Sequence, residues 1–112
     1  MKIELNSLGN VYLFTLHGSL DYTASLKLLD AVTPHIGISG QKILLDFSEV
    51  SLVNSMGYVM LLRLLKASQT NGSLLKFCNL QGVTRESFEL MRFDDFKQAT
   101  SSRDEVLKTL QA

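Results

Sequence analysis

The chain of 112 residues is long enough to fold around one hydrophobic core, and we expect one domain over residues 1–112. Its 11 acidic and 11 basic residues balance, which argues against nucleic-acid binding and against electrostatic attachment to a membrane surface. No apolar run approaches the roughly 18 residues of a membrane span, and the N-terminus lacks a signal-peptide pattern, so we expect a soluble cytoplasmic protein.

The first predicted elements are two antiparallel strands. Residues 11–16 are almost all apolar or aromatic, a density that indicates a strand covered on at least one face. Residues 2–5 are expected to pair with it as a hairpin, through a loop over residues 6–10. The tetrapeptide Gly18-Ser19-Leu20-Asp21 is expected to break the second strand, because glycine and small polar residues favour turns.

A helix is predicted after this break. Asp21 or Thr23 is a suitable N-terminal cap, since a short side chain with an oxygen accepts a hydrogen bond from a free amide of the first turn. Pro34 and Gly37 predict the end or a bend of this helix. Its apolar residues at i, i+3 and i+6 spacing are Leu26, Leu29 and Val32.

The central segment carries the clearest signals. Residues 42–47 form a short apolar run that reaches Asp46, which is typical of a strand buried on both faces in the middle of a sheet. A short hydrophilic crossing is expected to follow this strand. A helix is then predicted from Ser55 to about Asn71, ending at Gly72, because glycine suits the C-terminal end of a helix.

Strands and helices alternate through the rest of the chain. A strand is expected over residues 74–80, a helix over 83–91, an edge strand over 96–99 and a final helix over 103–110. This order predicts an α/β fold with a mixed, mostly parallel β-sheet of four to five strands and about four α-helices. The single cysteine, Cys78, excludes an intramolecular disulfide, and its apolar surroundings indicate a buried, inert thiol.

Three short motifs follow one another along this order of elements. They are Gly18-Ser19-Leu20-Asp21, then Asp46-Phe47-Ser48 with Val53-Asn54-Ser55-Met56-Gly57, and then Met91-Arg92-Phe93-Asp94-Asp95-Phe96. Together they resemble the STAS family, and in particular the domains that act as anti-sigma factor antagonists. The resemblance covers essentially the whole chain, and it implies the STAS fold, a protein-binding function and no cofactor.

The predicted helix that starts at Ser55 has two different faces when its residues are projected at about 100° each. The face expected to lie against the sheet holds Gly57, Met60, Leu61, Leu64 and Ala67, with Ser68 as its one polar member. The opposite stripe holds Ser55, Val59, Leu62, Arg63 and Lys66. Scattered exposed apolar residues are ordinary on protein surfaces, and the alternative is that this stripe is a docking surface for a partner with Ser55 as its switch.

Ser55 itself has two interpretations. Local chemistry makes it a helix N-terminal cap, a role that serine and asparagine both perform well. The resemblance implies instead that Ser55 is the phosphorylated serine of an Asp-Ser-x-Gly motif. Its partners would then be a serine kinase, often itself an anti-sigma factor of the histidine-kinase-like ATPase type, and a metal-dependent serine phosphatase. The unphosphorylated form would bind the kinase in a partner-switching pathway that regulates transcription.

Asn54 departs from the family motif, where an aspartate is usual. The amide keeps the capping ability but removes a negative charge, which eases repulsion against a phosphate and also removes an acidic feature available to a kinase. Asp21 and Asp46 occupy the family's loop positions beside the helix start, where each is a candidate for partner binding or for turn and capping chemistry. The resemblance and the projected helix stripe together predict the partner-binding residues, which are Asp21, Asp46, Asn54, Met56, Val59, Leu62, Arg63 and Lys66.

Other chemistry is not indicated by the sequence. His17 and His35 have no second ligand at metal-binding spacing, Ser55 has no base beside it, and no glycine-rich phosphate loop is present, so we expect a protein that is not an enzyme. A second hypothesis from the resemblance is a small STAS subunit that docks constitutively on the ATPase or permease of an ABC lipid-transport system. A direct ligand sensor would need a cavity.

Overall fold

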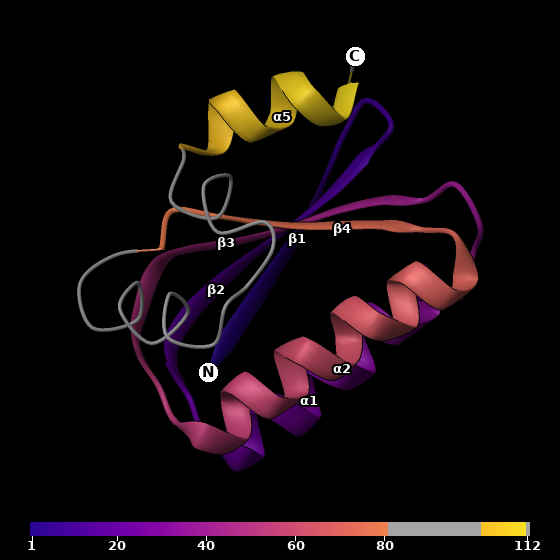
Figure 1. The fold of residues 1–112 in the computed structure, drawn as a ribbon. Helices are drawn as coiled ribbons and strands as arrows, with labels where there is room; N and C mark the ends of the chain where they lie inside the picture. The colour runs from indigo at the N-terminus through magenta and orange to yellow at the C-terminus, as the bar shows by residue number, and fades with distance from the viewer. Residues whose placement is uncertain (81–101, 112) are drawn as a thin grey trace.

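The computed structural model describes residues 1–80 and 102–111, which form a four-stranded sheet with helices on both faces (Figure 1). The strand order is β1-β2-β3-β4, with β1 antiparallel to β2 and the other pairs parallel. The predicted α/β fold with a mixed, mostly parallel sheet is confirmed. The elements in chain order are β1 (Lys2–Leu8), β2 (Val11–Leu20), α1 (Tyr22–Ile36), β3 (Lys42–Val53), α2 (Ser55–Asn71), β4 (Leu74–Cys78) and α5 (Arg103–Gln111).

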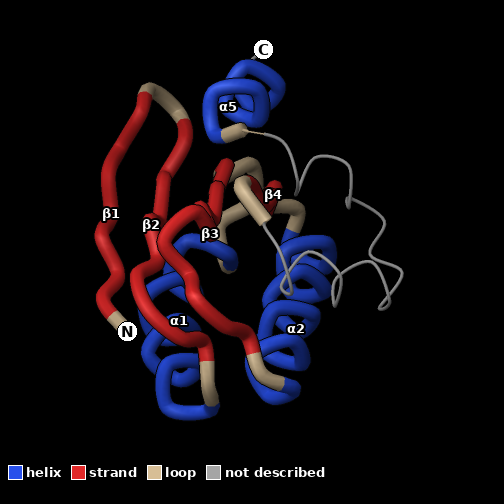
Figure 2. The backbone as a smooth tube through the Cα atoms, turned by 90° about the vertical axis from the view of Figure 1, so that its left-hand side faces the viewer, coloured by secondary structure: helices blue, strands red, loops and turns tan. Residues whose placement is uncertain are grey.

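The helix predicted over residues 83–91, the edge strand over 96–99 and the third motif lie outside the described residues. Helices α1 and α2 connect successive parallel strands that are stepped in one direction across the sheet. Right-handed connections therefore place both helices on the same face, as Figure 2 shows. Helix α5 lies on the opposite face.

The sheet is apolar on both faces, and alternate side chains of β3 are buried in two separate cores. Ile43 and Leu45 belong to the larger core under α1 and α2, whereas Leu44 points to a smaller core under α5. All three side chains are fully buried, so the prediction of a central strand covered on both sides is confirmed. The smaller core consists of Val11, Leu13, Leu44, Cys78, Val106 and Leu110.

The first two strands are longer than predicted. Strand β1 continues to Leu8, and the hairpin closes at residues 9 and 10 instead of through a loop that starts at residue 6. The expected break at Gly18 is wrong, because β2 continues through it to Leu20. Gly18 adopts a φ of 104°, and the pairing of β2 with β3 shifts register beside it, so the glycine forms an irregularity within the strand.

Strand β3 extends to Val53, and the expected hydrophilic crossing after residue 47 is therefore wrong. This second half of β3 pairs in parallel with the end of β2, where Val53 lies opposite Leu20. Its side chains alternate, since Val53 is 5% exposed and faces the core while Leu52 is 50% exposed. The polar composition of this segment reflects an exposed strand rather than a loop.

Helix α1 is capped by Asp21, as predicted, and it continues past Pro34 to end at Ile36. The expected apolar stripe was partly wrong, because Leu26 is 44% exposed while Val32 is buried. The residues that face the core follow i, i+4 spacing and are Ala24, Leu28, Val32 and Ile36. The bounds predicted for α2 are confirmed, with Gly72 in the left-handed conformation at its end, and α5 starts at Arg103 as expected.

Candidate functional site at the start of helix α2

Asn54 and Ser55 have different roles at the start of α2. Asn54 is the N-terminal cap, with an extended backbone and a side-chain oxygen that accepts a hydrogen bond of 2.9 Å from the Gly57 amide. Ser55 is the first helical residue, is exposed, and forms no hydrogen bond with any residue in the described part of the chain. The capping role considered for Ser55 therefore belongs to Asn54, and the exposed Ser55 hydroxyl has no partner among residues 1–80 and 102–111.

The end of β2 fixes the position of this helix start. The Leu20 carbonyl oxygen accepts a hydrogen bond of 3.1 Å from the Asn54 amide. A Cβ atom on Gly57 would lie only 2.5 Å from the same oxygen, so glycine allows the first turn to approach the strand this closely. Asp21, the next residue after Leu20, caps α1 through a hydrogen bond to the Ala24 amide. The starts of α1 and α2 consequently lie at one edge of the molecule (Figure 1).

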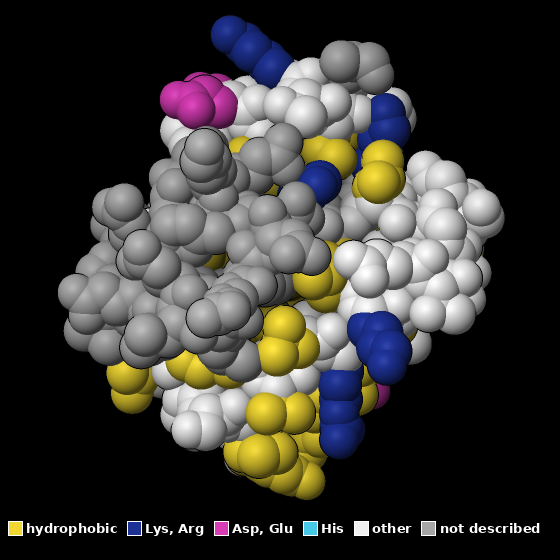
Figure 3. All heavy atoms as spheres, in the orientation of Figure 1, with side chains coloured by type: hydrophobic (Ala, Val, Ile, Leu, Met, Phe, Trp, Pro, Cys, Tyr) yellow, Lys and Arg dark blue, Asp and Glu magenta, His cyan; other side chains and the backbone are white. Residues whose placement is uncertain are grey.

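Exposed apolar side chains follow Ser55 along α2. Met56, Val59 and Leu62 are 44%, 39% and 36% exposed, as the projected stripe predicts. Two apolar side chains near this helix start were missed by sequence reasoning: Tyr22 at the start of α1 and Leu52 near the end of β3, which are 52% and 50% exposed. Figure 3 shows hydrophobic side chains gathered over the N-terminal part of α2.

The buried face of α2 is close to the prediction. Gly57, Met60, Leu61 and Leu64 are buried, and the buried Ser68 exchanges hydrogen bonds with Ser73 after the helix end. Tyr58 is also buried, although the projection did not place it on this face, and Ala67 is only partly buried.

The exposed face of α2 is electropositive. The helix contains no aspartate or glutamate, so no side-chain charge of its own offsets the positive end of its dipole. Arg63 and Lys66 are exposed, and neither forms an ion pair within residues 1–80 and 102–111. Lys and Arg side chains lie beside the hydrophobic patch in Figure 3. An acidic or phosphorylated group would meet favourable potential along this face.

Seven of the predicted site residues share the exposed side of α2 or its cap: Asn54, Ser55, Met56, Val59, Leu62, Arg63 and Lys66. Asp21 lies near the start of α2, because it follows Leu20, whose carbonyl oxygen accepts a hydrogen bond from the Asn54 amide. Asp46 does not join them. It lies within β3 rather than in a loop beside the helix start, it is only 3% exposed, and it sits under the face covered by α5.

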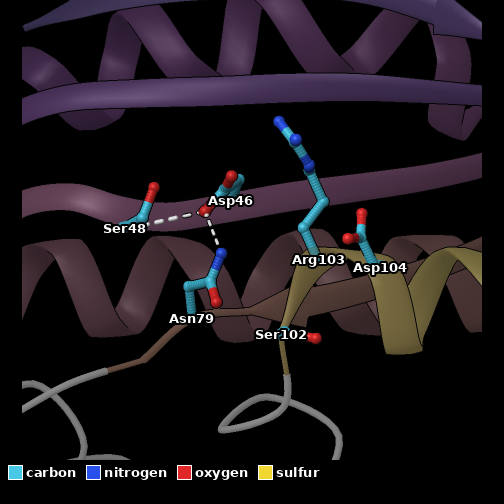
Figure 4. A pocket seen from close by; sticks show the side chains of 6 residues that line it. All are labelled: Asp46, Ser48, Asn79, Ser102, Arg103 and Asp104. Atoms are coloured by element: carbon cyan, nitrogen blue, oxygen red, sulfur yellow. Dashed lines mark hydrogen bonds between the residues drawn. The ribbon is translucent and has the colours of Figure 1, made fainter.

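Asp46 instead forms the floor of a polar cavity between β3, the end of β4 and the start of α5 (Figure 4). One carboxylate oxygen accepts hydrogen bonds of 2.9 Å from the Ser48 amide and from the Asn79 side chain. Asn79 has a positive φ of 59°, a conformation that asparagine tolerates at a strand end. The cavity has a volume of about 320 Å³ and is lined by Asp46, Ser48, Asn79, Ser102, Arg103 and Asp104.

The single cysteine and the two histidines lie in different surroundings. Burial raises the pKa of the Cys78 thiol far above its ordinary value, and the negative charge of Asp46 adds to this effect. The predicted burial of this thiol is confirmed. His17 lies 3.4 Å from Glu4, while His35 packs against the Tyr12 ring. No cluster of His, Cys, Asp and Glu in the described ranges is arranged to hold a metal ion, and no described helix meets the length and hydropathy of a membrane span.

The protein is a small α/β domain with a mixed sheet, and the exposed start of its helix α2 carries the second sequence motif. The profile of the STAS domain family matches residues 2–106. The chain therefore belongs to the STAS family, and the resemblance inferred from its motifs is confirmed. Comparison of the sequence with curated proteins found no match.

Solved structures share this fold at low sequence identity. A putative anti-sigma factor antagonist from Thermotoga maritima has a TM-score of 0.82 at 14% identity, over 98% of this chain and 95% of its own. The Bacillus anti-sigma factor antagonist SpoIIAA in its unphosphorylated form has a TM-score of 0.77 at 15% identity, over 98% and 96%. The murine anion transporter Slc26a9 has a TM-score of 0.78 at 20% identity over 95% of this chain. The chain spans only 18% of Slc26a9 and 18% of another neighbour, Mglu.

Proposed function

We propose that this STAS domain is a phosphorylation-gated binding module that acts in the cytoplasm as an anti-sigma factor antagonist. In its unphosphorylated form the α2 face binds a serine kinase of the histidine-kinase-like ATPase type. Phosphorylation of Ser55 releases the kinase, and a metal-dependent serine phosphatase restores binding. The observation that carries this proposal is the exposed Ser55, whose hydroxyl has no hydrogen-bond partner in the described part of the chain and lies beside the exposed Met56, Val59 and Leu62.

The energetics favour a switch at this position. A phosphate brings about −1.5 to −2 charge units. In the free domain the helix dipole and the first amides of α2 accommodate this charge. Against an apolar partner surface the same charge must be desolvated, and a differential cost of about 3 kcal/mol lowers affinity about a hundredfold. SpoIIAA, whose structure is known in both unphosphorylated and phosphorylated forms, supports the compatibility of this fold with the modification.

The test uses the full chain purified from its native host. Intact mass and peptide mapping should find phosphate on Ser55, and the co-purifying kinase with ATP should label the wild type but not Ser55→Ala. Ser51→Ala, which removes another exposed serine on the adjacent strand, is the matched control and should be labelled like the wild type. Ser55→Asp should weaken the complex. Equal labelling of Ser55→Ala and the wild type would refute Ser55 as the acceptor.

A constitutive docking subunit is the second candidate function. The similarity to Slc26a9 supports it, because there the related fold is part of a membrane transporter. In that role the α2 face would bind an ATPase or permease irrespective of Ser55. A complex with transport proteins that survives Ser55→Asp would favour this candidate over the switch.

A further inference from the structure

Arg63 and Lys66 form an exposed pair of cations on α2 without an acidic partner among the residues that the structure describes. They lie three residues apart, no acid on the helix pairs with them, and neither is in the last turn, where a cation would offset the helix dipole. Like charges at this spacing repel weakly. Neither forms an ion pair with any part of the chain that the structure describes. Their contribution to the isolated helix is therefore unfavourable.

Solubility alone would be served by charges of either sign at many positions. What distinguishes Arg63 and Lys66 is their place, since they continue the stripe that starts at Ser55 and runs through the half-exposed Val59 and Leu62. Apolar contacts in the middle with charges at one end are the arrangement of a protein-binding patch with a polar rim.

We propose that the partner protein carries carboxylates that meet Arg63 and Lys66 beside its own apolar centre. The partner is thus a protein whose docking face is acidic at the end that lies over the middle of α2. This inference rests on the proposed function and names the chemistry of its partner. It also adds a second component to the switch, because a phosphate on Ser55 lowers the net positive charge of the face that an acidic partner approaches.

The charges and distances show how this component acts. The two cations contribute two positive charges, and the start of a helix about half of another, while a phosphate supplies about −1.5 to −2. At about 1.5 Å per residue, Lys66 lies roughly 16 Å along the helix from Ser55, or about two Debye lengths at physiological salt. The phosphate therefore does not pair with the cations. It lowers the net positive charge that an approaching acidic partner meets, which lowers the association rate, and the effect is largest at low salt.

An anionic membrane is a poorer occupant for this face. Two cations attract such a surface only weakly, and stable attachment requires a second signal such as a lipid chain or a polybasic cluster. Val59 and Leu62 are only 39% and 36% exposed, so they offer a shallow surface for a protein rather than side chains that enter a bilayer.

The first test is kinetic and uses the kinase that labels Ser55. The double substitution Arg63→Gln with Lys66→Gln should lower the association rate constant about tenfold at low salt, flatten its dependence on ionic strength and change dissociation less than about twofold. The control removes two charges from other faces, with Lys27→Gln and Lys108→Gln, and should behave like the wild type. An association rate and salt dependence equal to those of the control would overturn the proposal.

The two hypotheses fail in different ways. If phosphate on Ser55 leaves binding unchanged while the loss of Arg63 and Lys66 slows association, the switch fails and the acidic partner stands. If phosphate abolishes binding while the double substitution has no effect, the switch stands and the acidic partner fails.

The second test detects the contact between Lys66 and a partner carboxylate directly, and it does not need an identified kinase. In cells of the native host, a carbodiimide joins a lysine amine to a carboxylate in contact with it, as an amide, while the reagent takes up the water and leaves as a urea. The expected product links Lys66 to an Asp or Glu peptide of another protein. Links at Lys27 or Lys108 without any at Lys66 would overturn the proposal. So would binding to phosphatidylglycerol vesicles that depends on Arg63 and Lys66 while association with protein does not.

Discussion

The close approach of α2 to β2 gives a quantitative prediction for Gly57→Ala. The new Cβ would lie 2.5 Å from the Leu20 carbonyl oxygen, 3.0 Å from Val53 Cγ1 and 3.1 Å from Leu20 Cγ. Carbon–oxygen contacts are ordinarily about 3.3 Å or longer, so the first turn of α2 must move away from β2 by roughly 0.8 Å. The obstructing oxygen belongs to the backbone and cannot rotate aside as a side chain would.

The cost of this movement exceeds the gain from a better helix former. Overpacking of a tight site costs about 1–3 kcal/mol, whereas the gain in helix propensity is at most about 1 kcal/mol. The movement also strains the hydrogen bond from the Asn54 amide to Leu20 and the Asn54 cap, and the cap contributes about 1 kcal/mol. We expect a net loss of about 2 kcal/mol in the free energy of unfolding, or a fall in Tm of roughly 8 °C.

Urea and thermal unfolding followed by circular dichroism measure this loss, and Gly37→Ala is its matched control. Gly37 has a φ of −70°, and the nearest described atom that a Cβ there would meet is the Thr33 carbonyl oxygen at 3.9 Å. The control should be as stable as the wild type or slightly more stable, because alanine has less backbone freedom in the unfolded chain. If both alanine variants unfold together with the wild type, the close approach of α2 does not constrain residue 57.

Three further predictions concern the cap, the exposed stripe and the buried thiol. Asn54→Ala should lower the free energy of unfolding by about 1 kcal/mol while Asn54→Asp stays within a few tenths, as urea titration would measure; equal losses would exclude capping as the cause. Val59→Gln with Leu62→Gln should leave the unfolding free energy within about 0.5 kcal/mol per site but raise the dissociation rate of the kinase complex; a larger loss of stability would make them packing residues. Cys78 should resist thiol reagents until the protein unfolds, and rapid labelling of the folded protein would contradict its burial. Because the pKa of the folded thiol is raised, its contribution to stability is present below the ordinary thiol pKa of 9.0 and is lost as pH rises above it.

The bounds of α2 could be predicted because both of its ends carry local chemistry. Asn54 accepts a hydrogen bond within the first turn, and Gly72 takes the left-handed conformation that ends the helix. The end of β3 could not be predicted in the same way. Residues 48–53 are mostly polar or exposed, and they form a strand because the long β2 lies beside them, which is a pairing between distant parts of the sequence.

The site residues differ in the same way, because some positions follow from local sequence patterns and others depend on distant parts of the chain. The stripe with Val59 and Leu62 follows from helical periodicity alone, and its exposure agrees with that projection. Tyr22 joins this end of the molecule only because the end of β2 holds both helix starts. The burial of Asp46 depends on α5, which comes much later in the chain and covers that face of the sheet. Local sequence patterns contain no signal for either arrangement, although alternation toward the buried Val53 could have indicated an exposed Leu52.

Capping and phosphorylation are competing interpretations of Ser55 in the sequence alone, and the structure assigns the cap to its neighbour Asn54. Because the Asn54 side chain satisfies the Gly57 amide, a modification of the Ser55 oxygen would not remove the hydrogen bond that holds the helix start. An amide in place of a carboxylate at residue 54 also leaves no side-chain charge to repel a phosphate within the first turn. The free domain should therefore tolerate phosphate with little loss of stability, and the penalty would fall on the complex, where a switch requires it.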